Sequence, residues 1–115
     1  MVLPVLVQKD IGVLGMKCMG AGKILQSKTV SAVDCLHYAM SLPTSTVITG
    51  CESVGLLDQA IHAALTFQPL SAEAVTALLD RTRDAAKDGK YEAFKTSDKH
   101  DGTAKHPQWL ESSVI

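Results

Sequence analysis

Apolar residues along the chain fall into short blocks that read alternately as strand and helix. Residues Gly12–Met16 and Thr46–Thr49 are short runs rich in apolar or β-branched side chains, and each is followed by a loop containing glycine. Between them, residues 31–42 carry apolar side chains at helical spacing. Two strands joined by one helix over this length predict a parallel βαβ unit. Because both strands lack a polar face, we expect them to be buried on both sides.

Residues typical of helix starts and helix ends mark the limits of three helices in this part of the chain. Ser31, with Asp34 three residues later, predicts a capping box, and Pro43 ends that helix. Ser53 and Ser71 are expected to begin the two helices that follow, which are predicted to end near Pro69 and Gly89 respectively. The apolar stripes predicted to face inward are Val33, Leu36, Ala39 and Met40, then Val54, Leu57, Ile61, Ala64 and Leu65, and finally Val75, Leu78 and Leu79.

Both ends of the chain differ from this pattern. Residues 2–9 suit either a strand or the last turns of a helix, and Gln8-Lys9-Asp10 before Gly12 favours the helix end. A start in the middle of an element suggests a fragment. Residues 1–88 therefore form the structured part, whereas residues 89–115 are expected to form a polar surface tail held by Tyr91, Phe94 and Trp109.

Two strands do not make a stable open sheet by themselves. The neighbours that this sheet lacks are expected from a missing N-terminal part, from a partner chain, or from self-association through exposed strand edges.

Composition narrows the class of protein. The 115 residues have a net charge of −1, 46% hydrophobic residues and 4% aromatics, which predicts one small globular domain or part of a larger one. A near-neutral chain gives no reason to expect nucleic acid as a partner, and no apolar run is long enough to span a membrane. Three widely spaced cysteines and no signal peptide favour reduced thiols and a cytoplasmic location.

The loops after the two strands are the candidate binding site. Small residues at strand ends that lead into helices can place backbone N–H groups around a phosphate. The first loop, with Lys17, Gly20 and Lys23, matches neither the P-loop nor the dinucleotide fingerprint, so a flexible loop and a phosphate cradle are equally good interpretations. In the second loop, Ser53 is either a phosphate ligand or an ordinary helix cap, and an inward Glu52 would repel a phosphate.

Other chemistry-bearing residues have simpler interpretations. Cys18 and Cys51 both follow strand ends and are candidates for a redox-sensitive pair, but small buried hydrophobes is the simpler interpretation of all three cysteines. His37, three residues after Asp34, suits a solvated surface pair better than a metal site, because one helical turn supplies no third ligand. We predict no metal site and no catalytic residue in this chain.

Five segments taken together resemble the aldo/keto reductase family, in particular the C-terminal part of one bacterial-type branch. They are Gly12–Gly20, Tyr38–Pro43, Val47–Gly50, Tyr91–Thr96 and Asp101–Leu110, and they run in order over nearly the whole chain. The family folds as a (β/α)8 TIM barrel that binds NADP(H) and reduces aldehydes and ketones. The resemblance thus implies an α/β fold made of the last two strands of such a barrel and the elements around them. A whole barrel takes about 250 residues.

The resemblance also implies where the cofactor binds. Lys17, Cys18, Met19 and Gly20 would lie along the pyrophosphate. Gly50, Cys51 and Ser53 would approach the adenosine phosphate, and Gln59 falls at an acidic or amide position on the next helix. Gly50 and Leu56 stand where the family often has a basic residue near the 2′-phosphate, so NAD(H) is not excluded.

The family's catalytic Asp, Tyr, Lys and His lie on earlier strands that have no counterpart here. The resemblance therefore implies a chain that supplies cofactor binding to an NAD(P)H-dependent reductase, whose small carbonyl substrate would bind only to the complete enzyme. The alternative is a non-catalytic truncated fragment that acts as a protein-interaction module through its strand edges.

Overall fold

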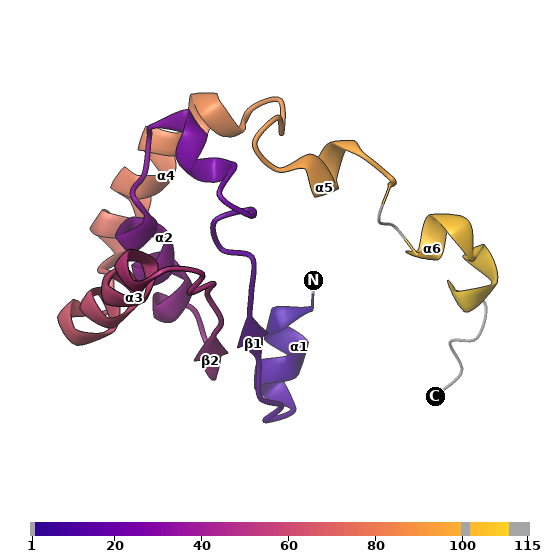
Figure 1. Cartoon of the computed structure of the whole chain (residues 1–115). Coiled ribbons are helices and arrows are strands. Elements are labelled where there is room, and N and C mark those ends of the chain that lie inside the picture. The colour runs from indigo at the N-terminus through magenta and orange to yellow at the C-terminus, as the bar shows by residue number, and fades with distance from the viewer. Residues whose placement is uncertain (1, 100–101, 111–115) are drawn as a thin grey trace.

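The computed structural model describes residues 2–99 and 102–110, and it is mostly helical (Figure 1). Two short parallel strands lie beside the longer helices (Figure 1). The elements in chain order are α1 (Leu3–Gln8), β1 (Leu14–Gly15), the 3-10 helix η1 (Ile24–Ser27), α2 (Ala32–Ser41), β2 (Thr46–Val47), α3 (Val54–Thr66), α4 (Ala72–Ala86), α5 (Ala93–Thr96), α6 (Gly102–Lys105) and η2 (Pro107–Leu110).

The two strands pair in parallel, as the sequence predicts, with Leu14 opposite Thr46 and Gly15 opposite Val47. The Ile48 amide donates to the Gly15 carbonyl at 2.8 Å, which continues the pairing past the end of β2. Each strand is only two residues long, shorter than predicted. Parallel pairing brings the loops that follow the strands to the same edge of the sheet.

Serine caps begin the three longest helices, as predicted. The Ser31 hydroxyl accepts from the Asp34 amide at 3.0 Å, and the Asp34 carboxylate accepts from the Ser31 amide at 2.9 Å. Ser53 and Ser71 accept from the amides three residues later in the same way. Of the strand and the helix considered for residues 2–9, the structure has the helix, as α1 over Leu3–Gln8.

The core consists mainly of side chains of α2, with one residue from α3. Its buried apolar residues, among those described, are Ala32, Cys35, Leu36, Ala39 and Ala63. His37 on α2 bonds the Ala63 carbonyl at 2.9 Å, and its ring meets that of Phe67 edge-on at 5.6 Å between centroids. The predicted solvated pairing of His37 with Asp34 is therefore wrong, because tertiary packing turns the imidazole toward α3.

Helix α4 is attached to α2 by polar contacts. Arg81 pairs with Asp34 at 3.1 Å, and the Leu70 amide just before α4 donates to the Ser41 hydroxyl at 3.0 Å. The capping acid of α2 thus also anchors α4.

The prediction that the chain forms part of a TIM barrel is wrong. Barrel strands are buried on both faces by an inner layer of side chains and an outer ring of helices. Here the described residues form only one pair of two-residue strands, and Leu14 on β1 is 65% exposed with Met16 after it at 63%. The structure is instead a mostly helical assembly with a minimal sheet.

The prediction that the apolar stripe of α3 faces inward is also wrong. Its residues Val54, Leu57, Ile61, Ala64 and Leu65 are exposed, Leu65 at 82%, whereas Ala63 is 1% exposed. Helical periodicity finds an apolar stripe but does not say which neighbour exists to cover it. α2 meets the alanine side of α3 instead.

The C-terminal segment extends away from the helical body (Figure 1). The radius of gyration is 16.2 Å, compared with about 13 Å for a compact chain of this length. Tyr91 is half-buried against the body, while the side chains of Phe94 and Trp109 lie outside the described residues. The division into residues 1–88 and 89–115 stays a prediction.

Candidate functional site

A groove of about 510 Å³ lies where the loops after β1 and β2 meet. Its lining comes from four places: the loop after β1, the 3-10 helix η1, the loop after β2, and the first turns of α3. The lining residues are Met16, Lys17, Cys18, Met19, Ala21, Gly22, Leu25, Ile48, Thr49, Gly50, Glu52, Leu56 and Gln59.

The groove gathers five of the eight residues that the resemblance assigns to a cofactor: Lys17, Cys18, Met19, Gly50 and Gln59. They lie up to 42 positions apart in sequence, and parallel pairing of the short strands is what brings them together. Gln59 reaches the groove because it lies on the half-buried side of α3.

The remaining three predicted residues, Gly20, Cys51 and Ser53, belong to the same loops but do not line the groove. Ser53 acts as the helix cap that its sequence position predicts, accepting from the Leu56 amide at 3.2 Å. Ser31 and Ser71 make the same bond on their own helices, so capping by itself explains Ser53.

The loop after β1 is tightly turned. Lys17, Gly20, Ala21 and Gly22 all have positive φ, and the Gly20 amide donates to the Lys17 carbonyl at 2.8 Å. A Cβ at Gly20 would lie 3.1 Å from Cγ1 of Ile24 and 3.3 Å from the Tyr91 carbonyl oxygen. Gly20 is therefore required by backbone conformation and close packing, without appeal to a ligand.

The electrostatics of the groove are mixed. Lys17 is the cationic side chain in its lining and Glu52 the anionic one. The N-terminus of α3 lies at the end of the second loop, where a helix dipole favours negative charge. The arrangement can accept a phosphate beside Lys17, but Glu52 opposes a second negative group near Gly50.

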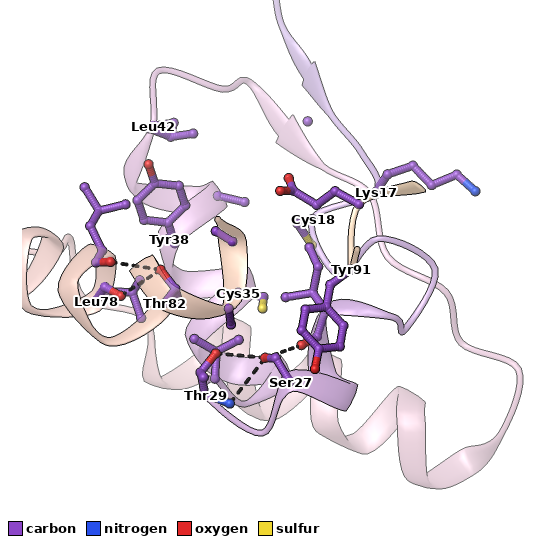
Figure 2. A pocket seen from close by; sticks show the side chains of 18 of the residues that line it. Lys17, Cys18, Ser27, Thr29, Cys35, Tyr38, Leu42, Leu78, Thr82 and Tyr91 are labelled. Carbon is purple, nitrogen blue, oxygen red and sulfur yellow. Dashed lines mark hydrogen bonds between the residues drawn. The ribbon is translucent and has the colours of Figure 1, made fainter. Parts of the chain in front are cut away.

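A second cavity, of about 540 Å³, lies on the α2 and α4 side of the loop after β1 and was not predicted (Figure 2). Apolar and aromatic side chains from distant segments line it, among them Tyr38, Leu42, Leu78 and Tyr91. Lys17 extends away from these side chains (Figure 2). Ser27 and Thr29 bond each other at 2.8 Å, so the polar groups at this end are already paired. No local pattern in the sequence signals such a cavity, because it depends on where α4 packs.

The three cysteines have different environments. Cys51 is exposed, Cys18 is half-buried and Cys35 is buried. Burial, together with the neighbouring Cys18 and Asp34, raises the pKa of Cys35 to about 11. Burial also raises the pKa of Cys18, although the backbone amides of Cys18 and Met19 partly oppose this. Cys18 thus shares the apolar cavity with Cys35, not with the Cys51 that sequence position suggests (Figure 2).

Over residues 2–99 and 102–110, no three His, Cys, Asp or Glu side chains cluster closely enough to hold a metal ion. Within the same ranges, no helix combines the length and apolarity needed to cross a bilayer.

In comparisons with known proteins, no family model, curated protein or solved structure matches this chain.

Proposed function

We propose that the chain binds the phosphate portion of a nicotinamide dinucleotide, NADP(H) or NAD(H), in the groove between the loops after β1 and β2. It would serve as the cofactor-binding part of an NAD(P)H-dependent aldo/keto reductase that reduces aldehydes and ketones. The observation that carries the proposal is that the groove gathers Lys17, Cys18, Met19, Gly50 and Gln59 from separate segments. Nucleotide binding in the groove does not depend on a barrel, whereas the reductase role rests on the resemblance alone.

The chemistry of the groove supports a phosphate ligand. Lys17 offers a flexible ammonium, and the loop around it has the positive φ angles that let backbone N–H groups turn toward an anion. The start of α3 adds a favourable dipole. Hydride transfer to a carbonyl and protonation of its oxygen would need residues outside this chain, which would contribute no catalytic group. Reduced cysteines agree with a cytoplasmic location.

Calorimetric titration with NADH and NADPH tests the proposal. Saturation at about 100 times the dissociation constant should stabilise the fold by about 2.7 kcal/mol. Lys17→Gln should weaken binding about twofold to fivefold, the loss of one exposed ion pair. Lys23→Gln is the matched control, because Lys23 lies in the same loop but does not line the groove. If neither NADH nor NADPH binds, the proposal is refuted.

A second candidate function is favoured by the exposed sheet. β1 and β2 form a two-stranded sheet among the described residues, and Leu14 and Met16 are more than 60% exposed. Exposed strands of this kind are templates for pairing with another chain. A non-catalytic interaction module would self-associate through this edge, whether or not a cofactor is present.

Sedimentation equilibrium distinguishes the two functions. An edge-driven module should show a mass that rises with concentration, unchanged by NADPH and reduced by Leu14→Asp. Leu65→Asp is the control, because Leu65 is even more exposed than Leu14 but lies on α3. A monomer at all concentrations would exclude the interaction module.

A further inference from the structure

The Glu52 carboxylate lies directly over Gly50, at the carboxyl end of β2. A Cβ added to Gly50 would be 2.7 Å from one carboxylate oxygen of Glu52 and 2.9 Å from the other. Only a glycine leaves room for the carboxylate in this position. Because Glu52 also lines the groove, its negative charge forms part of the binding surface.

Lys17 and Glu52 divide the groove by charge. Lys17 comes from the loop after β1 and Glu52 from the loop after β2, and both face the same space. A phosphate is attracted to the ammonium and repelled by the carboxylate. An ionised carboxylate only accepts hydrogen bonds, so the group that suits Glu52 is a hydroxyl donor. A fitting ligand therefore carries phosphate at one point and free hydroxyl groups at another.

Resting on the proposed function, we propose that Glu52 selects a dinucleotide whose adenosine ribose has a free 2′-hydroxyl, so that the groove takes NAD(H) in preference to NADP(H). In doubly wound dinucleotide-binding folds, a carboxylate that accepts from the ribose 2′-hydroxyl recognises NAD, and Glu52 offers the same chemistry. A 2′-phosphate would replace that donor with an acceptor and would bring negative charge against Glu52. Both changes weaken the binding of NADP(H) and leave the binding of NAD(H) unaffected.

The rest of the lining reinforces this selection. Leu56 and Gly50 offer no charge near Glu52, and among the described lining residues Lys17 is the cation. The pyrophosphate, which both dinucleotides share, competes for that single ammonium. A 2′-phosphate would then find no cation of its own, whereas a 2′-hydroxyl needs none.

Parallel titrations of the full chain with NADH and NADPH test the assignment. The wild-type chain should bind NADH about tenfold more tightly than NADPH in low salt, the order expected for one like-charge contact. Glu52→Gln should bring the ratio close to one, mainly by improving NADPH binding. Gly50→Ala should shift it in the same direction, because the added methyl group displaces the carboxylate without removing its charge.

Asp58→Asn is the matched control, because Asp58 is an exposed acid on α3 that does not line the groove. It should leave the ratio unchanged. Equal wild-type affinities, tighter binding of NADPH, or a ratio unmoved by both Glu52→Gln and Gly50→Ala would overturn the role of Glu52 and leave the proposed function standing. Failure of both dinucleotides to bind the wild-type chain would overturn both.

Discussion

The imidazole Nε2 of His37 lies 2.9 Å from the carbonyl oxygen of Ala63, and this bond joins α2 to α3 beside the core. Because a carbonyl oxygen only accepts, the ring nitrogen must donate. Ala63 is the least exposed of the described core residues, at 1%. The contact therefore fixes the helix that carries Leu56 and Gln59 into the groove.

His37→Ala should destabilise the fold by about 1–3 kcal/mol, because it leaves a shielded carbonyl without its donor. Urea unfolding followed by circular dichroism measures the loss. His62→Ala, on the exposed side of α3, should change stability little. Equal effects of the two substitutions would mean that the His37 bond contributes nothing specific.

Asp34 should make stability depend on pH in the acid range. Partial burial favours the neutral carboxyl, but hydrogen bonds from Ser31 and the neighbouring Arg81 outweigh it and lower the pKa of Asp34. A lowered folded-state pKa gives stability that is present above the unfolded-state value, about 3.9, and lost as pH falls through the folded-state value. Thermal unfolding between pH 2 and 7 should show this loss in the wild-type chain.

Asp34→Asn should lower the melting temperature at pH 7 and flatten the acid limb of the same curve. Asp58→Asn provides the comparison, because its exposed side chain makes no capping bond. An acid limb unchanged in Asp34→Asn would show that other carboxyl groups control it.

Gly20→Ala should destabilise the chain by about 1–2 kcal/mol, because left-handed backbone strains a residue with a Cβ. Its φ is +57°, and the new Cβ would also press on Ile24 at 3.1 Å. Gly55→Ala is the opposite case: it lies in α3 with no atom within 4 Å of the added Cβ. There alanine should stabilise by about 0.5–1 kcal/mol. Chemical denaturation of both variants checks the contrast, and a neutral Gly20→Ala would contradict the tight turn.

Iodoacetamide should label the three thiols in the order of their exposure: Cys51 first, then Cys18, then Cys35. The pKa of Cys35, raised to about 11, leaves very little thiolate at pH 8. Its labelling should be at least about a hundredfold slower than that of an ordinary exposed thiol, because the thiolate is the reacting form. Mass spectrometry after timed quenching measures the rates. In 6 M urea the three labelling rates should become similar, because the fold no longer shields the thiols. A difference that persists in urea would have its cause in the local sequence and not in the fold.

Local features were predictable from the sequence because their causes lie within a few residues. Ser31 with Asp34, Ser53 and Ser71 begin their helices as predicted, and Pro43 follows the end of α2. Each cap satisfies amide groups of its own helix, so no distant segment can change the outcome. The parallel pairing of the strands and the meeting of the loops that follow them were also predictable, because a helix crossover between two short strands favours this topology.

Tertiary structure decided which apolar surfaces are covered. The stripe from Val54 to Leu65 has helical spacing, yet α2 packs on the opposite alanine side. Leu14 on β1 and Thr46 on β2 remain exposed where a barrel would bury them. His37 was likewise predicted to face solvent, but in the structure its imidazole bonds the Ala63 carbonyl. Burial depends on neighbours far along the chain, and periodicity marks an apolar face without specifying its partner.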